Sequence, residues 1–295
     1  MLQWGSLRLV LPAVIALACG ALFDSARAQT DLPSATTAQN SAAKQVAVDL
    51  ELVLAVDVSL SIDSREALLQ RQGYVEAFRD PLVVEAIGSG ILGRMSVLYF
   101  EWANSAHTQL IVDWMLIDSP ASAAAFAAAL ERRRPGPAHY TSISGAIDFA
   151  AALFDSNGYD GTRQVIDVSG DGPNNWGDLV NRARDRAVAQ GVTINGLPIL
   201  DRNIGPFSRY NIANLDLYYR DCVIGGPASF IVVAENFEAF ASAIRRKLIL
   251  EIAGLHPLEA PFPGYQPAQA IDGDARVSPP CDIGEQLLRS RVDDF

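Results

Sequence analysis

Histidine and cysteine are scarce in this chain, which has three of each among its 295 residues. The histidines are His107, His139 and His256, and no two of them stand close together in the sequence. A zinc site needs a cluster of such ligands, so zinc binding is not expected. Hydrolysis by a nucleophilic serine needs a neighbouring base, for which the chain offers few histidines. The Gly-x-Ser-x-Gly elbow of serine hydrolases is missing as well, so a serine hydrolase is not expected.

The sequence also lacks the glycine-rich loops that hold phosphate groups. No Gly-x-x-x-x-Gly-Lys loop occurs, and no Gly-x-Gly-x-x-Gly fingerprint follows the first expected strand. Basic residues are few as well: 23 Lys and Arg stand against 34 Asp and Glu, for a formal net charge of −11. A surface of this sign repels nucleic acid and anionic membranes, so we expect neither as a partner.

The first 28 residues have the pattern of a signal peptide. Arg8 precedes an almost wholly apolar stretch from Leu9 to Phe23, and Ala26-Arg27-Ala28 supplies the small-x-small pattern of a cleavage site. The apolar run is short for a membrane span, no stop-transfer pattern follows it, and Cys19 has a poor context for lipidation. We therefore expect cleavage near Ala28, a periplasmic or secreted protein, and no stable membrane span after cleavage.

Cleavage would leave Cys222 and Cys281 as the cysteines of the mature chain. Two cysteines in an oxidising compartment suggest one disulfide, which would tie the tail to the body, and two free thiols are the alternative. Residues 29–46 are rich in Ala, Thr, Ser, Gln and Asn and are expected to form a flexible leader. Residues 47–254 would then form one domain, and residues 255–295 a proline-rich tail packed on it.

Between the leader and the tail, strand-like and helix-like stretches alternate. The expected strands are Leu52–Val56, Met95–Phe100, Gln109–Met115, Gln164–Val168, Val192–Leu197 and Phe230–Val233. The expected helices are Arg65–Phe78, the stretch from Pro120 to about Arg133, Ser142–Phe154, Asp178–Gln190 and Phe237–Ile252. This order predicts a three-layer, doubly wound α/β fold, with a mainly parallel sheet, helices on both of its faces and one antiparallel edge strand.

Polar oxygen donors follow two of these strands and precede one of these helices. Asp57, Ser59 and Ser61 come directly after the first strand, Asp171 comes just after a later strand, and Thr141 stands at the start of a helix. Open α/β sheets bind ligands beyond the carboxyl ends of their strands, and carboxylates and hydroxyls suit a small, hard cation. Each of these residues by itself is equally an ordinary turn residue or helix cap.

Together the five residues resemble the metal-ion-dependent adhesion site (MIDAS) of von Willebrand factor type A domains, in order and in strand–loop–helix context. The resemblance covers residues 48 to about 252, and the Ser-Gly-Asp-Gly-Pro-Asn-Asn stretch resembles an uncharacterised secreted bacterial branch of that superfamily. It implies direct metal bonds from Ser59 and Ser61, and a direct or water-mediated bond from Thr141. Asp57 and Asp171 would hold coordinated waters. The implied cation is Mg²⁺, or else Mn²⁺ or Ca²⁺, with one position open to a carboxylate of a protein partner.

Four further residues are candidate partner contacts on the rim of this site. Asn174, Asn175 and Trp176 come shortly after the second aspartate, and His139 comes two residues before the threonine. Packing within the loops and, for the histidine, simple exposure to solvent are the other interpretations.

The expected function is binding, and no catalytic residues are predicted. Two alternatives remain open: metal-assisted hydrolysis of a phosphate ester by Asp57 and Asp171 around Mg²⁺, and a metal-free structural scaffold in a cell-envelope assembly. An aspartyl phosphatase would have a second Asp two residues after its nucleophile, where this chain has Ser59. That difference favours the binding function.

Overall fold

The computed structural model describes residues 45–104, 106–132, 139–200, 212–254, 265–267 and 276–292. The predicted signal peptide and nearly all of the predicted leader lie outside these residues. Within the described ranges, no helix is both long enough and apolar enough to cross a membrane.

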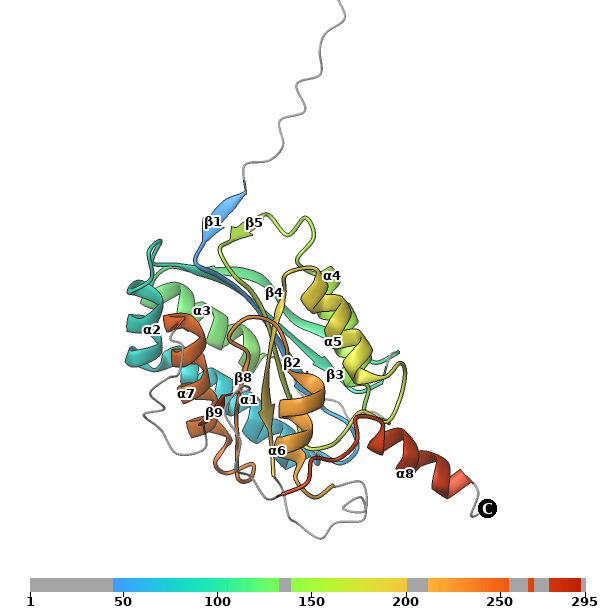
Figure 1. Cartoon of the computed structure of the whole chain (residues 1–295). Coiled ribbons are helices and arrows are strands. Elements are labelled where there is room, and N and C mark those ends of the chain that lie inside the picture. The colour runs from blue at the N-terminus through green and yellow to red at the C-terminus, as the bar shows by residue number, and fades with distance from the viewer. Residues whose placement is uncertain are drawn as a thin grey trace, which may run out of the picture. The chain divides into compact units, whose positions relative to one another are not determined.

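A mainly parallel sheet of seven strands lies at the centre of the described chain (Figure 1). Its strands, in spatial order, are β4 (Thr108–Ile117), β3 (Met95–Trp102), β2 (Leu50–Asp57), β6 (Gln164–Gly170), β7 (Thr193–Pro198), β8 (Phe230–Val232) and β9 (Tyr265–Pro267). Two short strands, β1 (Val46–Val48) and β5 (Tyr159–Gly161), pair with each other separately. The predicted antiparallel edge strand is confirmed as β4, which pairs with β3. A second antiparallel edge strand, β9, pairs with β8 and was not indicated by the sequence.

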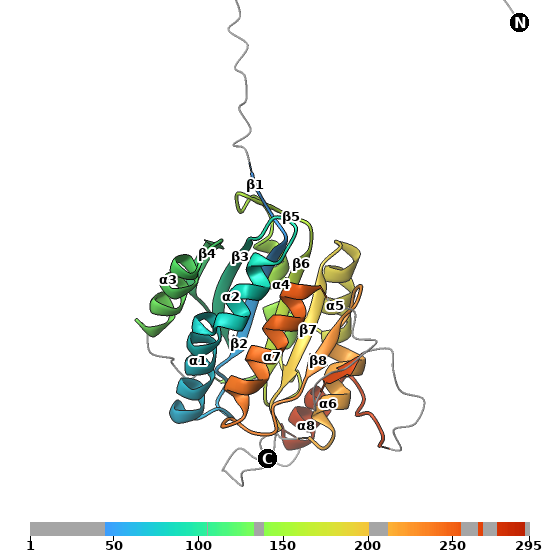
Figure 2. The same cartoon turned by 90° about the vertical axis from the view of Figure 1, so that its left-hand side faces the viewer.

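Helices cover both faces of this sheet, which confirms the predicted fold class. The first face carries α1 (Ser64–Arg79), α2 (Pro81–Gly88), α3 (Pro120–Glu131) and α7 (Phe240–Ala253) (Figure 2). The second carries α4 (Ile143–Ala152), α5 (Val180–Ala189), α6 (Leu215–Tyr218) and a π-helical turn, Tyr219–Val223. Alternate residues of β2 enter the two apolar cores, Leu52 and Leu54 the first, Val53 and Ala55 the second. Because both faces are covered, β2 is apolar at every position from Leu52 to Val56 instead of alternating between apolar and polar residues.

Capped helices follow two of the loops at the carboxyl end of the sheet. The Asp63 carboxylate accepts hydrogen bonds from the backbone N–H groups of Arg65 and Glu66, and Glu66 accepts one from Asp63 in return, so a capping box begins α1. The Ser142 hydroxyl accepts a hydrogen bond of 3.2 Å from the Gly145 N–H and begins α4. These caps fix the residues at which the loops after β2 and before α4 end.

A cluster of charged side chains is buried in the first core, between α7 and the sheet. The Lys247 ammonium is fully buried, lies 2.7 Å from the Asp167 carboxylate of β6, and also contacts the Glu251 carboxylate one turn later in α7. Asn195 of β7 donates a hydrogen bond of 3.0 Å to Glu251. Lys247 also lies 5.3 Å from the centroid of the Phe230 ring. Two buried carboxylates thus share one ammonium group.

This cluster makes folding stability depend on pH. Burial raises the pKa of Asp167 to about 7; Lys247 opposes this shift and Glu251 adds to it, and the phenol of Tyr74 on α1 also faces the carboxyl. Because the folded state holds this proton more tightly than the unfolded chain, the resulting stabilisation is complete below about pH 4 and is lost as the pH rises to about 7.

We expect Asp167→Asn to remove this pH dependence. Relative to the variant, the wild-type free energy of unfolding should fall by up to about 4 kcal/mol between about pH 4 and pH 7. Urea denaturation of both proteins at a series of pH values measures this difference. A difference that stays constant across the window would contradict the assignment.

Candidate functional site

The predicted donor residues lie at the carboxyl ends of neighbouring strands. Asp57 is the last residue of β2 and is fully buried, and Ser59 and Ser61 follow it in the loop that leads to α1. Asp171 comes directly after β6, which pairs in parallel with β2. Since parallel neighbours end at the same edge of a sheet, the two carboxylates and the two hydroxyls are brought together.

Hydrogen bonds connect these four residues. The Ser59 backbone N–H donates to Asp57 Oδ1 at 2.7 Å, and the Ser59 and Ser61 hydroxyl oxygens are 3.1 Å apart. The Ser61 hydroxyl donates to Asp171 Oδ1 at 2.7 Å, a contact between residues 110 positions apart in the sequence. The lack of a side chain at Gly170 leaves room for the Asp57 carboxylate beside β6, because a Cβ at Gly170 would lie 2.9 Å from Asp57 Oδ2.

Thr141 joins the site through the loop before α4. Its backbone N–H donates to the Asn175 side-chain oxygen at 2.9 Å, and the Asn175 N–H donates back to its carbonyl oxygen at 2.9 Å. Ser59, Ser61, Thr141 and Asn175 all line one open pocket of about 260 Å³. The loop after β2, the loop before α4 and the loop after β6 therefore meet around one cavity.

The electrostatics of the site are those of two carboxylates held close together. Burial and then the negative charge of Asp171 raise the pKa of Asp57 well above its usual value, while hydrogen bonds from Ser59 lower it. Burial, followed by the charges of Asp57 and Asp171, also raises the pKa of the neighbouring Tyr219 phenol. Asp57 Oδ2 is buried without a hydrogen-bond partner among the described residues. Hard oxygen donors with an unpaired buried carboxylate oxygen fit a small divalent cation.

The predicted rim residues divide into exposed and buried ones. His139 is exposed, Trp176 is 42% exposed, and Asn175 lines the pocket. Asn174, predicted as a partner contact, is instead fully buried, because its side-chain amide hydrogen-bonds to three groups inside the protein. For Asn174, the rim prediction is wrong.

Sequence reasoning missed Tyr140 as a rim residue. It is 44% exposed and lines the pocket, and its ring stacks on that of Trp176 with the centroids 4.5 Å apart. Its φ of 66° lies in the left-handed region, which a tyrosine adopts only where its surroundings enforce it. Its place between His139 and Thr141 is the signal that would have indicated it.

A mainly parallel sheet of this strand order, with helices on both faces, has a von Willebrand factor A-like fold. The chain belongs to the family described as "Protein of unknown function (DUF1194)", whose model matches residues 47–256. None of the curated proteins matches the sequence.

Solved structures with a similar fold include proteins from an animal and from bacteria. Proximal thread matrix protein 1 from the mussel byssus, solved with a zinc-occupied MIDAS motif, is 13% identical over 71% of this chain and 47% of that chain, with a TM-score of 0.49. The pilus adhesin SpaC from Lactobacillus rhamnosus GG is 14% identical over 71% and 31%, with a TM-score of 0.49. The conserved hypothetical protein BatB from Bacteroides thetaiotaomicron is 17% identical over 70% and 100%, with a TM-score of 0.43.

This chain thus spans about half the length of the mussel protein. At these identities the likeness concerns the fold alone.

Proposed function

We propose that this chain is a periplasmic or secreted binding protein that uses a Mg²⁺-type cation to hold an acidic group of a protein partner. The observation that carries the proposal is the contact of the Ser61 hydroxyl with both Ser59 and Asp171, beside the buried Asp57 carboxylate. Ser59, Ser61 and Thr141 line one open pocket, and burial together with repulsion from Asp171 raises the pKa of Asp57. A bound cation would offset this repulsion.

In this proposal the hydroxyl groups of Ser59 and Ser61 are ligands of the cation, and that of Thr141 binds it directly or through a water. Asp57 and Asp171 hold bound waters and supply the negative charge. The cation, Mg²⁺ or else Mn²⁺ or Ca²⁺, would supply a positive charge to which a carboxylate binds. Because hydroxyl ligands are neutral, most of that charge remains available at the mouth of the pocket.

The proposed location agrees with the disulfide between Cys222 and Cys281. Such bonds form and persist in oxidising compartments such as the bacterial periplasm and the extracellular space. The proposed signal peptide, cleaved near Ala28, would take the chain to such a compartment.

The phosphate-ester hydrolase is the less favoured alternative. Ser59 stands where an aspartyl phosphatase needs its second carboxylate, and Asp57 is fully buried, so its carboxylate is poorly placed to attack a substrate. The other alternative, a metal-free scaffold, differs from the proposed function in one measurable respect. A scaffold should bind no metal and should not respond to a chelator.

The test is a calorimetric titration of the chain from Gln29 onward with Mn²⁺ and Mg²⁺. We expect binding of one ion, and a loss of Mn²⁺ affinity of about tenfold or more in Ser59→Ala and Ser61→Ala, because each variant lacks one oxygen ligand. A peptide carrying a single glutamate should bind the Mn²⁺-loaded protein and be released by EDTA.

Ser242→Ala is the matched control, because this serine lies on the exposed side of α7 and its hydroxyl bonds only within the helix. It should bind Mn²⁺ as the wild type does. Absence of heat with both metals would refute the metal site and favour the scaffold. Chelator-sensitive turnover of p-nitrophenyl phosphate would favour the hydrolase instead.

A further inference from the structure

The last described segment of the chain, residues 276–292, packs against the loop that carries Asp171. It contains Cys281 and the helix α8 (Ile283–Val292), and we call it the C-terminal clamp. The Asn174 side-chain amide donates a hydrogen bond of 2.6 Å to Glu285 Oε1 on α8. The buried Gly284 lies so close to this loop that a Cβ there would overlap the carbonyl oxygen of Asn174. The clamp thus meets the site loop at Asn174 through both side chain and backbone.

A second connection runs through the buried Tyr218 of α6. Its hydroxyl oxygen accepts a hydrogen bond of 3.1 Å from the Asn174 backbone N–H. The same hydroxyl donates to the carbonyl oxygen of Cys281 at 3.4 Å. Tyr218 therefore links the site loop to the clamp at the residue that forms the disulfide.

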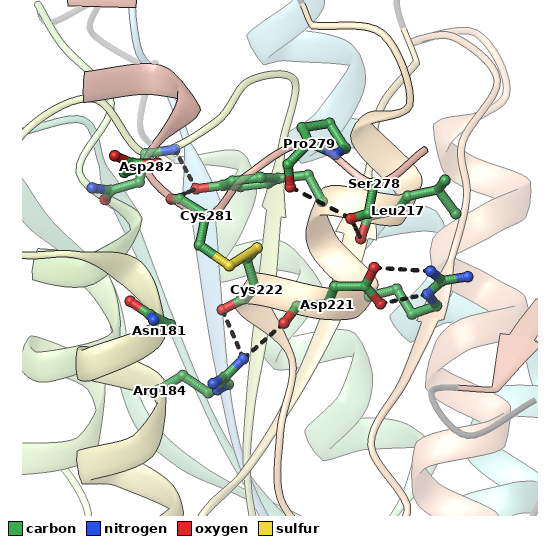
Figure 3. Close-up of a disulfide and its surroundings, with 12 residues drawn as sticks. Asn181, Arg184, Leu217, Asp221, Cys222, Ser278, Pro279, Cys281 and Asp282 are labelled. Atoms are coloured by element: carbon green, nitrogen blue, oxygen red, sulfur yellow. Dashed lines mark hydrogen bonds and ion pairs between the residues drawn. A yellow bond between two sulfur atoms is a disulfide. The ribbon is translucent and has the colours of Figure 1, made fainter. Parts of the chain in front are cut away.

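The disulfide and nearby hydrogen bonds fasten the clamp to the domain (Figure 3). Cys281 is bonded to Cys222, 59 positions earlier, in the π-helical turn after α6. Arg184 of α5 donates to the Cys222 carbonyl oxygen at 3.2 Å, and the Ser278 hydroxyl donates to the Leu217 carbonyl oxygen at 3.4 Å. The clamp is thus tied to α6 and, through Arg184, to α5.

Asn174 connects the clamp to two loops of the proposed metal site, the one that carries Asp171 and the one before α4. Its side-chain oxygen accepts a hydrogen bond of 2.9 Å from the Ser144 N–H in the first turn of α4, and its side-chain amide also donates to the Asp178 carbonyl oxygen at 3.0 Å. Asn174 stands three residues after Asp171, and Ser144 stands three residues after Thr141. The orientation of one buried amide therefore sets the spacing of two donor loops.

We propose that the C-terminal clamp is a positioning element of the metal site and that Glu285 is its positioning residue, an inference that rests on the proposed function. Glu285 holds the Asn174 amide in one orientation, and Asn174 holds the Asp171 loop against the start of α4. None of the residues that line the pocket of the site belongs to the clamp. Groups that orient metal ligands from outside the coordination shell tune metal affinity strongly.

One detail favours positioning over simple packing. Glu285 Oε2 is buried without a hydrogen-bond partner among the described groups, and burial raises the pKa of this carboxyl. An unpaired buried carboxylate oxygen is costly, and a glutamine could accept the same hydrogen bond at lower cost. A full negative charge on the acceptor strengthens the bond that orients Asn174.

The test compares Glu285→Ala, Glu285→Gln and the double variant Cys222→Ala/Cys281→Ala with the wild type. Two quantities are measured: Mn²⁺ affinity by calorimetry, and the hydrogen-exchange rates of the backbone N–H groups of Asn174 and Ser144 by NMR. We expect Glu285→Ala and the double variant to weaken Mn²⁺ binding about tenfold and to exchange faster at both amides. Glu285→Gln should restore part of the affinity, because it keeps an acceptor oxygen but lacks the charge that strengthens the bond to Asn174.

Gln286→Ala is the control on the same helix, since this exposed side chain bonds only to Asp282. It should leave both quantities unchanged. Unchanged exchange at Asn174 and Ser144 in Glu285→Ala would overturn the clamp, as would faster exchange with wild-type Mn²⁺ affinity. If the wild type binds no Mn²⁺, the metal function fails, while the exchange data still decide whether the clamp holds the loops.

Discussion

Replacing Asp57 by asparagine should strongly weaken divalent-metal binding and yet stabilise the metal-free protein. The buried carboxylate stands next to Asp171, and burial together with that neighbouring charge raises its pKa well above the usual value. Asparagine keeps an oxygen to accept the hydrogen bond from the Ser59 N–H and removes the repulsion. We expect Mn²⁺ affinity to fall by about 100-fold and the free energy of unfolding in EDTA to rise by about 1–2 kcal/mol.

Calorimetry with Mn²⁺ and urea denaturation in EDTA give the two numbers for Asp57→Asn. Asp155→Asn, an exposed aspartate in the loop after α4, is the control and should change neither. Opposite signs for binding and stability are the signature of a residue kept for a ligand rather than for the fold. If Asp57→Asn lost stability in EDTA, or kept its metal affinity, Asp57 would serve the fold instead.

Replacing Lys247 by methionine should cause the largest loss of stability of any single change considered. Methionine is close to lysine in volume but leaves the Asp167 and Glu251 carboxylates buried without their shared cation. Breaking a buried ion pair from one side costs about 3–5 kcal/mol. We expect a loss of that size in the free energy of unfolding near pH 8, measured by urea denaturation.

The loss from Lys247→Met should shrink toward pH 5, because Asp167 takes up a proton readily and so removes one of the uncompensated charges. Arg246→Met, one residue earlier on α7 and only half-buried, is the control and should cost little. The triple variant Lys247→Met/Asp167→Asn/Glu251→Gln should recover part of the loss, since no charge then remains. A loss that is the same at both pH values would contradict the account.

The convergence of Asp57, Asp171 and Thr141 on one edge of the sheet could be predicted, because each lies next to the end of a strand or the start of a helix. Strand β2 ends at Asp57, strand β6 ends just before Asp171, and α4 begins shortly after Thr141. The pairing of β2 with β6 then brings the two carboxylates together. The contact of Ser61 with Asp171 could not be predicted, because it depends on the conformations of two loops 110 positions apart.

Asn174 shows where sequence reasoning failed. An asparagine in a loop rich in Gly, Pro and Asn has the pattern of an exposed turn residue. Its actual position depends on Glu285, 111 positions later, and on Tyr218, 44 positions later. Neither partner is indicated by local patterning, and so no local rule reveals that this amide is buried.

Lys247 illustrates the same limit inside a correctly predicted helix. The stretch Phe237–Ile252 predicts an amphipathic helix, in which a lysine is expected to face solvent. The structure instead turns it toward β6, because Asp167 lies within an otherwise apolar strand and supplies a buried partner. The pairing of Lys247 with Asp167 follows from the packing of α7 against β6, which the sequence does not reveal.

The strand order of the sheet has a consequence for the way the chain folds as it emerges. β2 is synthesised before the other strands of this sheet and lies in its interior, with β3 and β4 added on one side and β6, β7, β8 and β9 added in turn on the other. Each new strand therefore meets an edge that already exists, and none has to be inserted between two strands that are already paired. A chain that is completed from one end can build its sheet outward by successive addition, with little apolar edge left waiting for a partner.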